Sequence, residues 1–300
     1  MRQAGNRCDG CQFAQRGVTD ARNRSRSDGV LCYGLRTMSS DLNSIQRAAS
    51  EQFARQSHRY GKGHILENIA DVQAALEKIS LPASAAVLDV ATGGGHTGLH
   101  LASLGHRVIL SDLTEAMLQR AGEAATARGL DVALRCHPAE AMPYADASFD
   151  LVTCRVAPHH FSSVAGFVAE VARVLKPRGF FLLIDGTVQD DEPEAEAWLH
   201  QVEQLRDPSH HRFLTPRQWG ELCRAVGLTV NVSELHLKKQ PDLNWYFETA
   251  ATPAENRQRV VELVAHAPAA VRKLFAIGEE EGRTIWWWPM LTLVAQKSGN

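Results

Sequence analysis

The chain has 300 residues, of which 44% are hydrophobic and 22% are charged, and its formal net charge is −2. This composition is typical of a water-soluble fold that is large enough for one full domain with an insertion. Its Lys and Arg residues are scattered, so we expect no nucleic-acid partner. No apolar run reaches the roughly 18 residues that a membrane-spanning helix requires, so we expect no membrane span.

The first forty residues are rich in Arg, Gly, Ser and Asp and lack an apolar period, which predicts a disordered leader over residues 1–40. Cys8 and Cys11 have the spacing of a zinc or redox pair, but no second pair follows and we expect no metal site. Met38 precedes the first patterned sequence and is a candidate start of translation. The scattered cysteines and the lack of a secretory signal favour a cytoplasmic compartment.

From residue 85 onward, strand and helix patterns alternate along the chain. Such alternation predicts a mostly parallel sheet that is covered by helices on both faces. The expected strands are residues 85–91, 106–112, 131–137, 148–156 and 179–185, and the expected helices between them are 97–105, 114–129 and 164–175.

The pattern changes after Asp185. A helix is expected over 215–227, a strand over 228–237, a helical stretch over 242–282 and a last strand over 284–297. Pro289 inside this last strand predicts a bulge or a position at the sheet edge. We interpret residues 41–300 as one domain, in which 189–282 carry an insertion that caps the substrate.

The stretch VLDVATGGGHTG, residues 87–98, runs from a strand into clustered glycines and a helix. Such a turn presents backbone N–H groups to a nucleotide, and both dinucleotides and S-adenosylmethionine bind in this way. Gly93, Gly95 and Gly98 satisfy G-x-G-x-x-G, and Asp112 follows at about the 20-residue distance of a ribose-binding acid. An NAD(P)-dependent oxidoreductase is therefore one alternative.

Asp89 favours the other cofactor. It ends the strand, with Ala91, Gly93 and Gly95 two, four and six residues later. A carboxylate here suits the ammonium group of a methionine moiety and would repel a pyrophosphate. The pattern resembles motif I of the class I S-adenosylmethionine-dependent methyltransferases, acid-x-Gly-x-Gly-x-Gly, with Ala91 at the first glycine position.

The resemblance extends over residues 85–185. SDLTEAML resembles the second motif of the family, which implies that Asp112 accepts hydrogen bonds from both ribose hydroxyls; ASFDLVTCRVAPHHF and VARVLKPRGFFLLID resemble the later strands. The chain is most similar to methyltransferase type 11, the group of the ubiquinone and menaquinone C-methyltransferases. This implies a Rossmann-like α/β fold with a seven-stranded, mostly parallel sheet and an antiparallel final hairpin.

The resemblance also implies the activity. We expect methyl transfer from S-adenosylmethionine to a small-molecule acceptor, with a quinone-type carbon or a phenolic oxygen as our guess for the methylated atom. A non-catalytic subunit that binds S-adenosylmethionine and regulates a partner is a further alternative. The oligomeric state stays open, with a homodimer as one alternative.

The resemblance also assigns the residues that bind the cofactor. Pro138 stands where relatives commonly have an acidic residue for adenine, so adenine contacts are expected from Ala139, Glu140 or Met142. A ring of Tyr60 near the sulfonium would gain cation–π attraction. The full expected set is Tyr60, Asp89, Ala91, Gly93, Gly95, Asp112, Leu113, Ala139, Glu140 and Arg155.

His159 and His160 are the candidate catalytic residues. They follow the fourth strand, and ligands of open parallel sheets bind beyond the carboxyl ends of the strands. A general base is needed only if the acceptor loses a proton, as a phenol does. The alternative of equal weight is that both histidines make structural hydrogen bonds. Arg206, Asp207 and His210 are interpreted either as part of a lid or as a solvated helix end.

Overall fold

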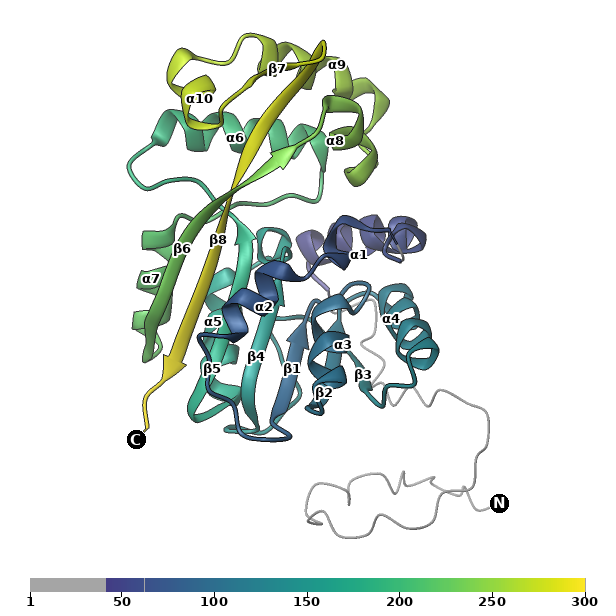
Figure 1. Cartoon of the computed structure of the whole chain (residues 1–300), viewed down its shortest axis with the longest axis vertical. Coiled ribbons are helices and arrows are strands. Elements are labelled where there is room, and N and C mark those ends of the chain that lie inside the picture. The colour runs from purple at the N-terminus through teal and green to yellow at the C-terminus, as the bar shows by residue number, and fades with distance from the viewer. Residues whose placement is uncertain (1–41, 62, 300) are drawn as a thin grey trace, which may run out of the picture. The chain divides into compact units, whose positions relative to one another are not determined.

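One mixed sheet organises the computed structural model, which describes residues 42–61 and 63–299 (Figure 1). The expected leader, the Cys8–Cys11 pair and Met38 lie outside the described residues. The strand order is β3-β2-β1-β4-β5-β8-β6, and β7 pairs with β8 outside this path. The strands are β1 (Ala86–Val90), β2 (Arg107–Asp112), β3 (Ala133–Cys136), β4 (Phe149–Arg155), β5 (Leu175–Gly186), β6 (Leu228–Gln240), β7 (Gly278–Glu280) and β8 (Arg283–Lys297).

The pairing confirms the expected sheet. Strands β1 to β5 pair in parallel, and β8 runs antiparallel to both β5 and β6. The short strand β7 is an addition to the expected seven. It falls within 242–282, which the sequence pattern predicted to be helical, and it pairs with the start of β8 across a turn at Glu281 and Gly282.

Helices cover both faces of the sheet because successive strand residues point to opposite sides. On β5, Phe181 and Leu183 belong to one buried cluster, whereas Leu182 and Ile184 belong to the other. The first cluster is covered by α5 (Val164–Val174) and α7 (Pro216–Ala225), and the second by α2 (Ala70–Leu76), α3 (His96–Ser103) and α4 (Glu115–Ala127).

A third buried cluster, which we call the cap, lies beyond the carboxyl ends of the parallel strands, at the top of Figure 1. Its large buried side chains include Trp198, Tyr246, Phe275 and Trp286. Its helices are α6 (Pro193–Arg206), α8 (Leu243–Ala250), α9 (Ala254–Ala265) and α10 (Ala269–Leu274). Residues 189–282 therefore contribute both to the cap and to the sheet layers, to which α7 and β6 belong. That this insertion caps the substrate stays a prediction.

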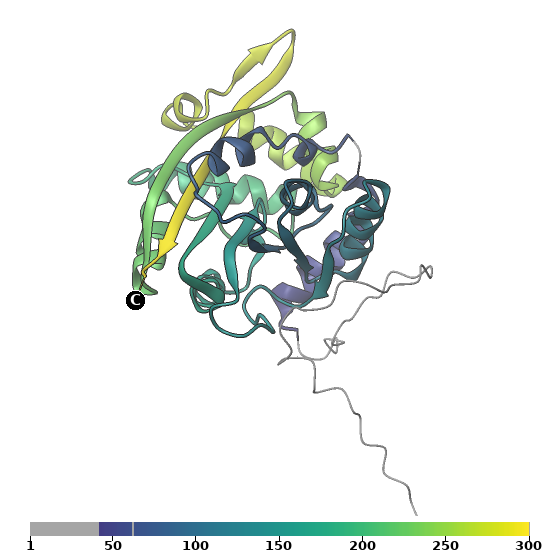
Figure 2. The same ribbon diagram turned by 60° about the horizontal axis from the view of Figure 1, so that its bottom comes forward.

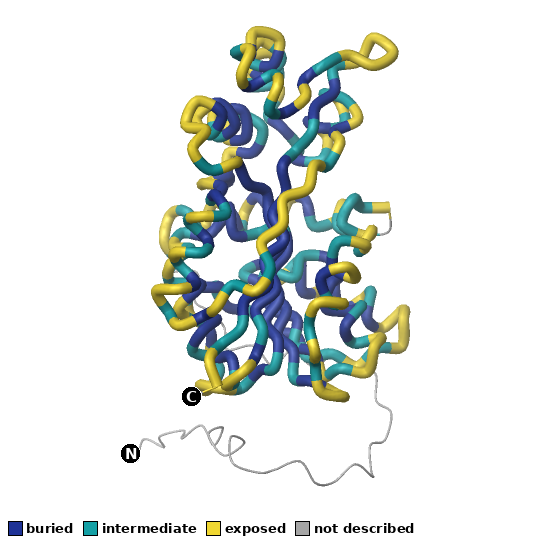
Figure 3. Tube along the Cα trace, turned by 60° about the vertical axis from the view of Figure 1, so that its left-hand side comes forward, coloured by how far each residue is buried: buried dark blue, intermediate teal, exposed yellow. Residues whose placement is uncertain are grey.

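Strands β6 and β8 connect the sheet to the cap, and Figure 2 shows both as long curved ribbons. Most of β8 is buried, and Figure 3 shows buried segments, in dark blue, gathered in the interior. Pro289 lies inside β8, with Leu237 of β6 as its partner, just past the last pair of β8 with β5 at Met290. Its carbonyl accepts a hydrogen bond from Thr187 N at 3.0 Å. The side of Pro289 that lacks an N–H thus faces the end of β5, beyond the last residue pair of these two strands. The register shift of β6 is not at Pro289 but between Val230 and Val232.

Helix α1 (Ser44–Gln56) lies between the carboxyl ends of the strands and the cap (Figure 1). An Asn43 capping box starts the helix. The side chains of Gln52 and Gln56 both donate to the backbone oxygen of Ala250 at the end of α8, at 3.2 and 3.1 Å. Within the described residues, no helix is long and apolar enough to span a membrane.

Candidate active site

The carboxylate of Asp89 organises the glycine-rich turn. It is 2% exposed and accepts hydrogen bonds from Thr92 Oγ1 at 2.5 Å, Gly98 N at 3.0 Å and Thr153 Oγ1 at 2.6 Å. Burial raises its pKa, while these hydrogen bonds act in the opposite direction. Asp89 therefore joins β1, β4 and the start of α3, and it also lines the cavity above the turn.

Two positions of this turn require glycine, one for its backbone conformation and one because no Cβ fits. Gly95 has φ +84°, and an added Cβ would lie 3.1 Å from both Ala121 Cβ and Leu99 Cδ1. At Gly94 an added Cβ would lie 2.4 Å from the backbone oxygen of Tyr60, so the turn and the segment after α1 approach each other closely. Ala91, the residue at the family's first glycine position, has φ +52°.

Asp112 ends the neighbouring strand β2 and faces the same turn. Its Oδ2 accepts from Gly93 N at 3.0 Å and its Oδ1 accepts from Thr114 N at 2.9 Å. Burial raises the pKa of Asp112 to about 6 against the hydrogen bonds from Thr114 and Gly93. Each carboxylate oxygen has a further lone pair, so Asp112 can accept additional hydrogen bonds from a ligand.

A first cavity, with about 950 Å³ of empty space partly open to solvent, lies between this turn and α1. All expected cofactor residues except Gly95, the residue before α3, line it. Sequence reasoning missed its His96, Met117 and His137; His96 follows the glycines directly, whereas only the fold brings Met117 and His137 to the cavity. His96 Nε2 is buried there without a hydrogen-bond partner among the described residues.

Glu140 joins α1 to the segment after β4. Its Oε1 accepts from Ser162 N and Oγ at 2.9 and 2.7 Å, and from Ser163 N at 3.2 Å. Its Oε2 accepts from Gln46 Nε2 at 3.1 Å. Glu140 thus fastens the helix that closes one side of the first cavity.

Arg155 ends β4 and fastens the opposite wall. Its guanidinium donates to both carboxylate oxygens of Asp71, at 3.0 and 2.8 Å, and to the backbone oxygens of Leu66 and Asn68 at 2.8 and 2.7 Å. The side chain is 6% exposed. Arg155 therefore lines the first cavity while its hydrogen bonds hold the segment between Leu66 and Asp71 in place.

A second cavity, with about 870 Å³ of empty space, lies between the carboxyl ends of the strands and the cap. His159 lines this cavity, and His160 lines both cavities. The other side chains shared by the two cavities belong to Phe53, Tyr60, Leu66 and Val156. The two cavities are therefore adjacent, with a common wall.

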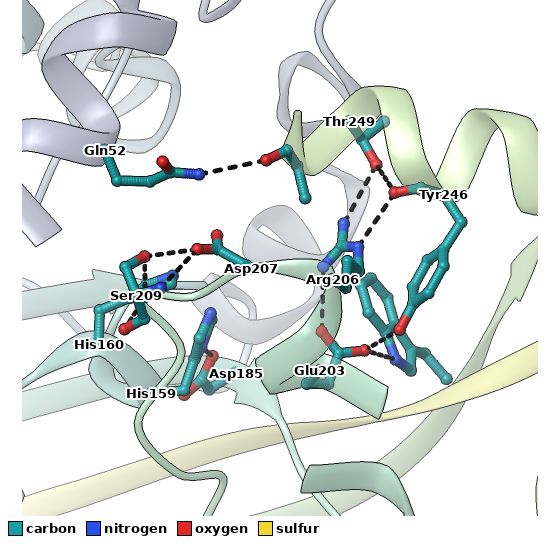
Figure 4. A network of polar contacts seen from close by, with 12 residues as sticks. Gln52, His159, His160, Asp185, Glu203, Arg206, Asp207, Ser209, Tyr246 and Thr249 are labelled. Atoms are coloured by element: carbon teal, nitrogen blue, oxygen red, sulfur yellow. Dashed lines mark hydrogen bonds and ion pairs between the residues drawn. The ribbon is translucent and has the colours of Figure 1, made fainter. Parts of the chain in front are cut away.

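The two histidines have different partners (Figure 4). His159 Nδ1 lies 2.7 Å from Asp185 Oδ1, and Asp185 is 1% exposed. His160 Nδ1 lies 3.0 Å from the backbone oxygen of Ser209, which can only accept. Both rings consequently carry the proton on Nδ1, which leaves the Nε2 lone pair of each as an acceptor.

The charge states of these histidines also differ. Burial acts to lower the pKa of His159, but the charge and hydrogen bond of Asp185 outweigh burial and the pKa is raised. Burial and the neighbouring His159 lower the pKa of His160 to about 3. Asp185 therefore stabilises the protonated form of His159, whereas His160 stays neutral.

Polar side chains of the cap complete the second cavity. Glu203 accepts from Arg206 Nη1 at 3.1 Å, from Trp288 Nε1 at 3.0 Å and from the Tyr246 hydroxyl. The Arg206 guanidinium lies over the rings of Tyr246 and Trp288, at 4.4 and 4.7 Å from their centroids. Asp207 accepts from Ser209 N and Oγ. Arg206, Asp207 and His210 all line this cavity, with Asp207 and His210 buried and Arg206 half-buried, so the interpretation as a solvated helix end is wrong and the role in a lid stays a prediction.

Comparisons with known proteins identify the family. A sequence profile described as a methyltransferase domain matches residues 88–183. The uncharacterized methyltransferase YcgJ of Bacillus subtilis is 32% identical over 227 residues, which cover 75% of this chain and 88% of YcgJ. Demethylmenaquinone methyltransferase of Deinococcus radiodurans is 38% identical over 101 residues, 33% of this chain and 42% of that protein.

Solved structures agree with this result. The crystal structure of YcgJ superimposes with a TM-score of 0.73 at 29% identity, covering 78% of this chain and 100% of that chain. A putative methyltransferase from Bacillus halodurans gives 0.72 at 30% identity, covering 76% and 99%. The chain belongs to the class I S-adenosylmethionine-dependent methyltransferases. This membership confirms the predicted family and enzyme class and disfavours the oxidoreductase alternative.

Proposed function

We propose that the chain transfers a methyl group from S-adenosylmethionine, held in the first cavity, to a small-molecule acceptor in the second, and that the reacting atom of this acceptor loses a proton. The observation that carries this proposal is the hydrogen-bonded pair of His159 and Asp185, which lies in the second cavity close to the wall shared with the first. A phenolic oxygen and a quinol-type carbon are acceptor atoms of this kind.

The first cavity fits the cofactor. The glycine-rich turn and Asp112 line this space together, and the buried His96 Nε2 lacks a partner that a polar ligand group can supply. Asp112 would accept from the ribose hydroxyls, Leu113 and Ala139 would contact adenine, and Tyr60 would lie near the sulfonium. When bound, S-adenosylmethionine supplies an electrophilic methyl group on a positively charged sulfur.

His159 would act as the general base. Its Nδ1–H donates to Asp185, which fixes the ring and favours its protonated form, so Nε2 can take the proton of the acceptor. His160, which stays neutral and lines both cavities, would orient the acceptor beside the cofactor. The walls formed by Phe213, Trp245 and Trp288 favour a planar acceptor.

The first test is a thermal-shift series with S-adenosylmethionine, S-adenosylhomocysteine, NAD and NADP. We expect stabilisation by the two sulfur nucleotides alone, because a ligand that binds the folded state raises its melting temperature. A shift with NAD or NADP alone would contradict the cofactor assignment. Stabilisation by the sulfur nucleotides without methylation of any phenol or quinol in a panel would favour the regulatory subunit.

The second test uses His159→Gln, with His211→Gln as the matched control because the His211 side chain is exposed. Loss of a general base typically lowers turnover by about 10²–10⁴-fold. We expect this loss in kcat for His159→Gln on the best phenolic substrate, with an unchanged Kd for S-adenosylhomocysteine. An equal loss in His211→Gln, or wild-type turnover in His159→Gln, would refute the role of the base.

A further inference from the structure

Lys238 is a cation of the second cavity without a counter-charge. It lies on β6, directly opposite Trp288 of β8, and is half-buried in the cavity wall. Its ammonium makes no hydrogen bond or ion pair with any residue that the structure describes. The adjacent Lys239, in contrast, lies on the other face of the strand and pairs with Glu280.

The other charged groups around this cavity are already partnered. Arg206 pairs with Glu203, and His159 pairs with Asp185. Asp207 accepts two hydrogen bonds from Ser209. Asp71 is the acid whose charge raises the pKa of Lys238, but its carboxylate accepts hydrogen bonds from Nε and Nη2 of Arg155. Lys238 is therefore the side chain of this wall that a negatively charged ligand can satisfy.

The surroundings of Lys238 make such a ligand favourable. Burial lowers the pKa of its ammonium, which means that the positive charge is poorly solvated in this wall. Aromatic side chains, Trp245 and Trp288 among them, line the same cavity and offer no anionic partner. A carboxylate at this point would form a charge-assisted hydrogen bond in a partly water-excluded environment, where such bonds are strong.

We propose that the methyl acceptor is a planar carboxylic acid, whose carboxylate binds Lys238 while its hydroxyl or enol end faces His159. Lys238 lies where β6 and β8 extend past the end of β5, and His159 is held at that end by Asp185. The two side chains thus face one cavity, Lys238 from β6 and His159 from the short turn of helix after β4. This inference rests on the proposed function, and it makes Lys238 the residue that selects an anionic acceptor.

The test is isothermal titration of protein saturated with S-adenosylhomocysteine, using three ligands of one shape: 6-hydroxy-2-naphthoate, its neutral carboxamide and the cationic aminomethyl analogue. A hydrogen bond to a charged group corresponds to roughly a tenfold to hundredfold difference in affinity. We expect the wild type to prefer the carboxylate over the carboxamide by this factor. Lys238→Met should abolish the preference, Lys238→Arg should retain it, and the matched control Lys239→Met should leave it unchanged.

Each other result overturns the inference. A preference for the amine would mean that the cavity binds a cationic ligand, at Asp207. Equal affinities for all three ligands, or no binding of any of them, would exclude an anion site. Loss of the preference in Lys239→Met would show a diffuse effect of net charge. Failure of the proposed function looks different: the carboxylate would bind in a Lys238-dependent manner without methyl transfer, or S-adenosylhomocysteine itself would not bind.

Discussion

Asp112 accepts hydrogen bonds from two backbone N–H groups and faces the first cavity, so a single substitution can test both its binding role and its charge. Asp112→Asn keeps the shape but replaces one acceptor oxygen with a donor. We expect a loss of about 1.5–3 kcal/mol in the binding of S-adenosylhomocysteine, measured by isothermal titration. Asp131→Asn, at an exposed position, is the control. An unchanged Kd for Asp112→Asn would refute the contact with ribose.

Wild type and Asp112→Asn should also differ in how their stability depends on pH. Burial raises the folded-state pKa of Asp112 from its ordinary value of 3.8 to about 6. The folded state therefore binds the proton more tightly, and the resulting stabilisation, fully present below 3.8, is lost as the pH rises through about 6. Asn does not titrate. Urea unfolding should show the stability of Asp112→Asn rising relative to wild type between these two pH values and then levelling off; a constant difference would contradict the raised pKa.

Arg178 gives a residue-level test of backbone strain. Its φ is +64°, which lies in the left-handed region. A non-glycine residue in the left-handed region costs about 1–2 kcal/mol of stability. Glycine avoids this cost, but its greater conformational freedom in the unfolded chain offsets part of the gain. We expect Arg178→Gly to raise the free energy of unfolding by about 1 kcal/mol. Arg178→Ala keeps the Cβ and should show no gain in the same urea titration; equal gains would point to the Arg side chain instead.

At the scale of elements, α1 is joined to the cap by two amides that share one acceptor. Gln52 and Gln56 both donate to the oxygen of Ala250, and both side chains are buried. Removing one donor leaves the carbonyl bonded to the other, whereas removing both leaves it unsatisfied at a cost of about 1–3 kcal/mol. A double-mutant cycle of Gln52→Met and Gln56→Met should therefore be non-additive, with the double variant less stable than the sum of the single ones. Additive effects in urea unfolding would exclude the shared acceptor.

The elements of the sheet and the turn were predictable from the sequence, because strand periodicity and the spacing of Asp89, Gly93 and Gly95 are local properties. The second cavity was not. Its polar groups come from the segment after β4 and from α6, β6 and β8, and no spacing within the chain relates His159 to Asp185 or Lys238 to Trp288. The sequence did point to the histidines and to Arg206 and Asp207, but it could not decide between part of a lid and a solvated helix end.

At the scale of the whole molecule, the shared wall couples the two cavities. Phe53, Tyr60 and His160 contact both spaces, so a ligand in one cavity changes the surface offered to the other. We expect S-adenosylhomocysteine to tighten the binding of 6-hydroxy-2-naphthoate by about fivefold or more, and the naphthoate to tighten S-adenosylhomocysteine by the same factor, as thermodynamic linkage requires. Titrations in both orders check this expectation. Identical Kd values with and without the second ligand would exclude coupling through this wall.

The position of β8 has a consequence for how the chain reaches this fold during synthesis. The strands β1 to β5 come first and pair among themselves, but β6 pairs only with β8 within the described residues, and the chain from Gln240 to Arg283 must be made in between. Until β8 emerges from the ribosome, β6 has no strand to pair with, and Leu228, Val230 and Val232, which pack into the buried clusters of the finished sheet, are uncovered. A nascent chain paused in α9 would thus expose the unpaired backbone edge and the apolar side chains of β6. Aggregation, and therefore chaperone binding, is most expected during this interval of synthesis.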